Sequence, residues 1–212
     1  MRTFLLLILI LSASGAFAHE TSEERLRVVI VSENAEATAI YLRIPVPLLF
    51  AKEAAARVSP AAAVEAPFLQ VVGDGGAHYL DQKAIERDPQ AFKARVLHTI
   101  AVTVDGRAPA ASVQAFAVHH AARLPPFGTP TEALAAIKRR ETLAELHIAD
   151  AYVDAHLAIR AVGSLLLAFP LDAIAFPGHV HLDNVFVDAR IEPPEERVRL
   201  GAITEPVEVT RP

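Results

Sequence analysis

The stretch LRVVIVSENAEATAIYLRI, residues 26–44, decides the fold class of this chain. Residues 26–31 and 37–44 are rich in β-branched side chains, and the polar segment 32–36 separates them. Two such runs joined by a short polar connection are typical of an antiparallel hairpin. Within the second run, Ile40 and Leu42 alternate with Tyr41 and Arg43, which is the two-residue period of a half-buried strand. The sequence therefore begins its folded part with a strand pair.

Three stretches beyond the hairpin have helical patterns. They are residues 48–58, residues 81–97, in which Asp88-Pro89 restarts the helix, and residues 132–143, which Thr129 or Thr131 can cap. Between the second and third, residues 98–104 and 113–119 alternate as strands do. Asp105-Gly106 is the strongest short turn signal in the chain, and it predicts a hairpin that joins these two strands.

The C-terminal third is predicted to be all β. Strand patterns cover residues 151–159, 164–169, 179–191 and 197–209, and prolines separate them. Repeated β–helix–β units, which build parallel sheets, are absent from the sequence. We therefore expect a mainly β fold with two or three helices (α+β), arranged as an antiparallel β-sandwich or an open barrel.

The N-terminus carries the three parts of a secretory signal. Arg2 is the positive residue, residues 4–11 are an unbroken apolar run, and Ala16-Phe17-Ala18 is a small-x-small cleavage site. The run is shorter than the roughly 20 residues that span a bilayer. We predict that residues 1–18 are a signal peptide and residues 19–212 a single periplasmic or secreted domain that begins at His19.

Composition narrows the function classes. Hydrophobic residues make up 52% of the chain, which is enough for a core and argues against disorder. There is no Cys, and Met1 is the one Met, so thiolate and methionine-rich metal sites are excluded. Charges of both signs are interspersed around a net charge of −5, so we expect no nucleic-acid partner. No second apolar run has membrane length, so we expect no transmembrane segment in the mature chain.

Four residues form the candidate metal site. Cleavage after Ala18 would make His19 the first residue, whose α-amine and ring nitrogen can both bind copper. His179 and His181 are two apart, so on a strand they point to the same face and can share a copper or zinc ion. Asp183 would share that face as a fourth ligand or as an acceptor that orients a ring. The alternative is that these rings are simply solvated at a strand end.

The remaining histidines have weaker claims to a site. His119 and His120 are adjacent, so they face opposite sides of a strand and only one of them can join a site. His78, His98, His147 and His156 are isolated, which favours structural roles. Nucleophile elbows, phosphate-binding loops and HExxH helices are absent from the sequence, so nothing in it indicates a familiar enzyme class.

The start of the mature sequence resembles the N-terminal periplasmic domain of HupE/UreJ-type membrane proteins, which are hydrogenase and urease accessory proteins. The likeness rests on His19, the hairpin of residues 26–44, the segment Ile44-Pro45-Val46-Pro47-Leu48-Leu49 and the turn Asp105-Gly106-Arg107. It implies an exported accessory domain linked to nickel uptake. The family's function is ascribed to a downstream membrane domain, and the sequence given ends at Pro212 before one. Transport is therefore not implied, and no functional residue of the family maps onto this chain.

Taken together, the patterns favour a non-enzymatic periplasmic binding or accessory domain whose ligand is a transition metal or a membrane or envelope protein. Two alternatives stay open: a mononuclear copper enzyme centred on His19, and a purely structural envelope protein. Copper or zinc near one equivalent after native purification would indicate binding, and oxygen-dependent turnover with a reductant would indicate an enzyme.

The first prediction concerns processing. Protein exported in a Gram-negative host should have the intact mass of a chain that begins at His19, because the A-x-A motif sets the cleavage site. A product that retains Met1, or one that begins at another residue, would contradict both export and an N-terminal metal site.

Overall fold

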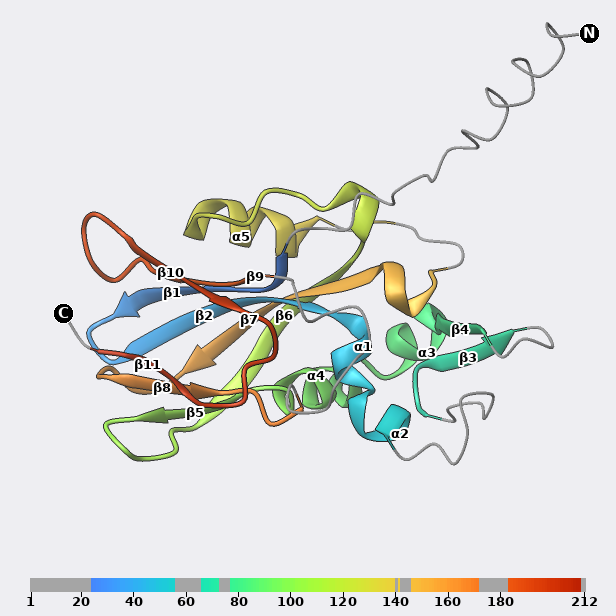
Figure 1. Ribbon diagram of the computed structural model, residues 1–212, viewed down its shortest axis with the longest axis horizontal. Helices are drawn as coiled ribbons and strands as arrows, with labels where there is room; N and C mark the ends of the chain where they lie inside the picture. The colour runs from blue at the N-terminus through green and yellow to red at the C-terminus, as the bar shows by residue number, and fades with distance from the viewer. Residues whose placement is uncertain are drawn as a thin grey trace, which may run out of the picture.

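In the computed structural model, which describes residues 24–55, 66–72, 77–139, 141, 146–171 and 183–210, the predicted hairpin lies inside the largest sheet (Figure 1). Strands β1 (Glu24–Asn34) and β2 (Ala37–Pro45) pair antiparallel, and the Asn34 side chain accepts a hydrogen bond from the backbone of Glu36 in the turn between them. The hairpin prediction is confirmed. Nearly every residue of β2 is buried, so both faces of this strand are covered.

Six strands make up the largest sheet, in the order β10-β9-β1-β2-β7-β6. The four added to the hairpin are β6 (Ala111–His120), β7 (Ala151–Ile159), β9 (Asp183–Asp188) and β10 (Glu195–Leu200). All neighbours pair antiparallel except β1 and β9, which run parallel. The single parallel pair departs from the antiparallel expectation. It arises because the chain returns from far along the sequence to the open edge of β1.

Two smaller sheets complete the β structure of the described chain. One has the order β11-β8-β5, built from β11 (Val207–Val209), β8 (Leu165–Ala168) and β5 (Ala101–Val104). The other is the pair β3 (Leu69–Val72) and β4 (Ala77–Leu80). The fold is thus mainly β, α+β and sandwich-like with open sheets, as the sequence predicted.

Five short α-helices occur in the described residues because two of the three predicted helical stretches are divided. They are α1 (Val46–Leu49), α2 (Ala51–Ala55), α3 (Gln82–Arg87), α4 (Pro89–Leu97) and α5 (Pro130–Lys138). The predicted restart is confirmed, since the Asp88 side chain caps α4 with Pro89 in its first turn. Thr129 caps α5 in a reciprocal capping box with Glu132. Two 3-10 turns, Ala121–Arg123 and Ile148–Asp150, flank the β6 and β7 strands.

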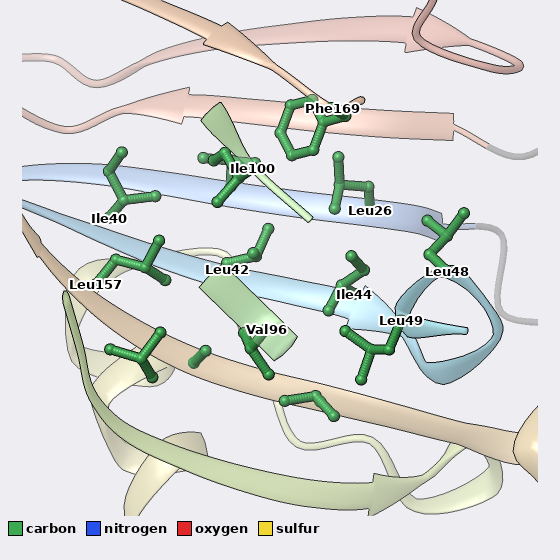
Figure 2. Packing of buried hydrophobic residues seen from close by; sticks show 14 of the residues in the cluster. Leu26, Ile40, Leu42, Ile44, Leu48, Leu49, Val96, Ile100, Leu157 and Phe169 are labelled. Carbon is green, nitrogen blue, oxygen red and sulfur yellow. The ribbon is translucent and has the colours of Figure 1, made fainter. Parts of the chain in front are cut away.

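Two hydrophobic clusters cover the two faces of the six-stranded sheet. On one face, alternate residues such as Ile40, Leu42 and Leu157 belong to one buried cluster with Val96 of α4 and Leu49 of α1 (Figure 2). On the other face, Ala39 and Tyr41 pack with Phe127 and with the buried side of α5. The period of β2 therefore sorts its side chains between two separate layers of packing.

The hairpin predicted around Asp105-Gly106 is partly wrong. The turn itself forms, with positive φ at both residues and two hydrogen bonds between the backbones of Val104 and Arg107. The strands on either side of it do not pair, because β5 joins β8 in the three-stranded sheet and β6 joins β7 in the six-stranded sheet. A tight turn dictates only its own residues, whereas burial of Leu165 and Leu167 gives β5 a better partner in β8.

The predicted strand at residues 197–209 is also corrected. It divides into β10 and β11, which belong to different sheets, and Gly201 adopts a positive φ of 69° just after β10. Of the strand predicted over residues 179–191, the structure gives β9 from Asp183 to Asp188. Residues 179–182 lie outside the described residues.

Candidate functional site

Three of the four predicted metal ligands, His19, His179 and His181, lie outside the described residues. The fourth, Asp183, is the first residue of β9, where it lies half-buried opposite Leu200 of β10 and Glu24 of β1. Within the described ranges, no group of three or more His, Asp or Glu side chains is arranged to hold a metal ion. The structure therefore leaves the predicted metal site as a prediction.

A buried ion pair is the strongest polar feature of the sheet face beneath α5. Arg43 on β2 and Asp154 on β7 are directly opposite in the strand register, so their side chains share a face. The guanidinium donates from Nε and Nη2 to the two Asp154 oxygens at 2.7 and 2.6 Å, the bidentate geometry in which Arg binds carboxylate most strongly. Asp154 is fully buried and Arg43 nearly so.

The segment before α5 closes over this ion pair. Arg43 also donates to the carbonyl oxygen of Pro125 at 2.8 Å, and its guanidinium carbon lies 4.5 Å from the centre of the Phe127 ring. These contacts use a third donor and the flat face of the guanidinium. The ion pair therefore fastens the 124–128 segment onto the sheet.

His119 extends the same cluster. Its Nε2 atom is 3.3 Å from an Asp154 oxygen and its Nδ1 atom is 3.7 Å from an oxygen of Glu141, which Arg139 contacts at 3.0 Å. The ring is fully buried, and neither nitrogen has a well-formed hydrogen bond among the described residues. As the sequence required, only one of the adjacent pair faces inward, while the His120 ring accepts a hydrogen bond from Ala122 instead.

The chemistry of this cluster is structural. A histidine between carboxylates resembles the base and orienting acid of a hydrolytic site, but such a site also needs a nucleophile in reach and room for a substrate. Here Arg43 already neutralises Asp154, and Phe127 and Pro125 cover the pair. We therefore assign the cluster to holding the α5 layer on the sheet.

Isolated histidines have mixed roles. His147 accepts a hydrogen bond from the backbone of Ala149 and so caps a 3-10 turn, a structural role. His156 has its Nε2 atom 3.2 Å from Glu33 and its ring 5.0 Å from that of Tyr41. Burial, and to a lesser extent the charge of Glu33, raise the pKa of the Tyr41 hydroxyl, so this phenol is a poor candidate for a base.

Strand β10 is the exposed strand at one end of the six-stranded sheet. It is an edge strand, and five of its six residues are exposed, Arg197 being intermediate. Val198 and Leu200 lie on the same side of it and are 51% and 74% exposed, which makes them the two most exposed large hydrophobic residues of the described chain. Beside them is a hollow of about 280 Å³, lined by Arg199, Leu200, Ala202, Ile203, Thr204 and Glu205.

Polar contacts hold β10 in place despite its exposure. Arg190, in the connection from β9 to β10, pairs with Asp188 at 2.8 Å and donates to the carbonyl oxygen of Gly163. Arg197 of β10 donates to the carbonyl oxygen of Glu208 in β11 at 2.9 Å, and Asn184 of β9 donates to that of Arg199 at 3.1 Å. The exposed edge is therefore a fixed surface and not a loose end.

Comparison of the chain with models of protein families, with curated proteins and with solved structures finds no match. The assignment of a site therefore rests on geometry. Among the residues that the structure describes, no helix is long and apolar enough to cross a membrane.

Sequence reasoning did not single out β10. The predicted strand of residues 197–209 omits Glu195 and Glu196 and merges the rest of β10 with the residues that follow it, although Pro193-Pro194 precedes β10 and Gly201 follows it. Those flanking residues were the available signal, because proline is common at edges and glycine ends strands. His119 was recognised as one of an adjacent pair, but its contact with Asp154 depends on strand order and was not predictable.

We predict that Asp154→Ala destabilises the protein by about 3–5 kcal/mol, because it leaves the Arg43 charge buried without its partner. The double variant Arg43→Met/Asp154→Leu should be more stable than Asp154→Ala, since it removes both charges. Urea unfolding followed by circular dichroism measures both. Glu195→Ala, in the exposed pair with Arg197, is the control and should change stability little. A loss near zero for Asp154→Ala would show that the pair does not fasten the fold.

Proposed function

We propose that this chain is an exported, non-enzymatic binding domain that holds a partner protein of the cell envelope along β10. The observation that carries the proposal is the edge strand itself, with exposed Val198 and Leu200 and the adjoining hollow. Extended segments add to such edges through main-chain hydrogen bonds, and their alternate side chains provide specificity. An exposed edge is an aggregation risk, so its retention on a folded surface favours a use for it.

The fixed position of β10 also supports a role in binding. A binding edge that is already fixed loses little conformational entropy when a partner strand pairs with it. The contacts of Arg190, Arg197 and Asn184 fix β10 in this way. The signal-like N-terminus and the resemblance to the exported domain of HupE/UreJ-type membrane proteins support a partner in the envelope.

Site-specific photo-crosslinking tests this function. A photoreactive amino acid at Leu200 should give a discrete adduct in cells that export the protein, and mass spectrometry should map the adduct to one short segment of one partner protein. Val198→Lys should weaken the adduct, because lysine on an edge opposes strand addition.

The control is the same photoreactive residue at Val71, which is 41% exposed on β3 in the two-stranded sheet, at the other end of the protein from β10 (Figure 1). It should not produce the Leu200 adduct. If both positions give the same set of adducts, or if Leu200 gives none, β10 is not the docking edge.

A second candidate function is the binding of copper or zinc by His19, His179, His181 and Asp183, and one observation favours it. Strands β1 and β9 are parallel neighbours, with Glu24 opposite Asp183, so the chain enters both strands at the same end of the sheet. His19 precedes Glu24 by five residues and His181 precedes Asp183 by two. At no more than about 3.6 Å per residue, these connections reach at most about 18 and 7 Å. This supports a shared site without fixing its geometry.

Metal titration of the mature protein tests the second candidate. We expect binding near one equivalent, and a tenfold or greater loss of affinity, at least about 1.4 kcal/mol, in the His179→Ala/His181→Ala variant and in a variant with one extra residue before His19. The extra residue leaves the imidazole but moves the α-amine away. Equal affinity in all three proteins would exclude this site, and oxygen-dependent turnover with a reductant would convert it into the copper-enzyme alternative.

A further inference from the structure

The two faces of β10 differ in chemistry. In the antiparallel pairing with β9, Val198 lies opposite Val185, and Glu196 lies opposite Val187. Glu196, Val198 and Leu200 therefore share the face of the sheet that α5 covers. Glu195, Arg197 and Arg199 lie on the other side, since successive strand residues alternate. A strand added to β10 meets one mainly apolar row and one charged row.

From this we infer that β10 selects a foreign extended segment whose residues alternate between apolar and acidic, and that it does not pair with a second copy of this chain. The inference rests on the proposed docking edge and names the chemistry of its partner. Carboxylates of the segment would face Arg199 and Arg197, and its apolar side chains would face Val198 and Leu200.

Self-pairing is disfavoured by the order of charges. Two copies of β10 that pair antiparallel are related by a two-fold axis perpendicular to the sheet. Residues opposite each other must have their side chains on the same face of the sheet. One residue at the centre of the pair therefore lies opposite the same residue of the second copy. Centred on Glu195, Glu196, Arg197 or Arg199, such a pair sets identical charges opposite each other. Centred on Val198, it sets Arg197 opposite Arg199 twice. Like charges directly opposite destabilise a strand pair.

The remaining register is blocked by the backbone. A two-fold pair centred on Leu200 would need the strand to continue through Gly201 and Ala202. Gly201 has a φ of 69°, which is incompatible with an extended strand, and the β10–β9 pairing ends at Leu200. Antiparallel two-fold pairing of β10 with a second copy is therefore disfavoured, whichever residue of the strand lies at the centre.

Arg199 supplies the charge that a partner can use. Arg197 is already engaged by Glu195 at 2.8 Å and by the carbonyl oxygen of Glu208. Arg199 is exposed, and within the described chain no ion pair engages its guanidinium. It borders the hollow beside Leu200, which leaves room for a carboxylate side chain to approach.

Two designed peptides test the inference. The matched hexapeptide Val-Glu-Val-Glu-Thr-Lys, run antiparallel to β10, sets valines opposite Leu200 and Val198, glutamates opposite Arg199 and Arg197, and lysine opposite Glu195. The control Val-Lys-Val-Lys-Thr-Glu keeps the apolar residues and inverts each charge. We expect about tenfold tighter binding of the matched peptide, from the cross-strand charge pairs combined. Amide hydrogen exchange should show new protection in residues 195–200.

The net charge of −5 makes this test stringent, because nonspecific attraction favours the control peptide, which carries the more positive charge. Arg199→Glu should reduce or reverse the preference. Arg123→Glu makes the same charge change at an exposed residue distant in sequence from β10, and it should leave the preference intact.

Equal affinity for the two peptides, tighter binding of the control, or protection outside β10 would overturn the inference. Sedimentation that detects a dimer abolished by Val198→Lys would overturn it as well, since the occupant would then be a second copy. If the Leu200 crosslink instead captures a foreign segment of other composition, this inference fails while the docking edge stands. If both experiments are negative, both fail.

Discussion

Burial of β2 on both faces is the constraint from which the rest of the structure follows. A strand in this position needs a layer on each side, and its residues alternate between the apolar cluster of Ile40 and Leu42 and the face beneath α5. Arg43 falls on the second face, where a charge is costly unless it is paired. Asp154 on the neighbouring strand supplies the partner, and the 124–128 segment supplies the cover. The position of α5 is thereby tied to one residue of the central strand.

Several elements of this architecture are determined by short stretches of the sequence. The 26–44 hairpin, the Asp88-Pro89 restart and the Thr129 cap all depend on residues within a few positions of one another, and all were predictable. The choice of strand partners was not. Asp105-Gly106 turns as expected, yet β5 and β6 part into different sheets, because burial across the whole chain decides the pairing. The candidate site shows the same division, since exposure of β10 depends on its being last in the strand order.

The two polar regions of the protein have different roles. Arg43, Asp154 and His119 are buried, and Arg43 donates its hydrogen bonds to Asp154 and Pro125 of the protein itself. Around β10, by contrast, Arg190 and Asn184 support a strand that faces solvent on both sides. Perturbed or buried ionisable groups often mark function, but here the buried cluster is scaffolding and the exposed, ordinary-looking strand is the better candidate.

The parallel pairing of β1 with β9 has a consequence for the order in which the protein folds. β1 leaves the ribosome early, but the strand that completes its outer edge lies about 150 residues further along the chain. Until that strand is made, β1 has an unsatisfied edge beside an apolar surface. Contacts this distant in sequence slow folding and prolong the time in which nascent chains aggregate. The six-stranded sheet can therefore be completed only after the last third of the chain has been synthesised.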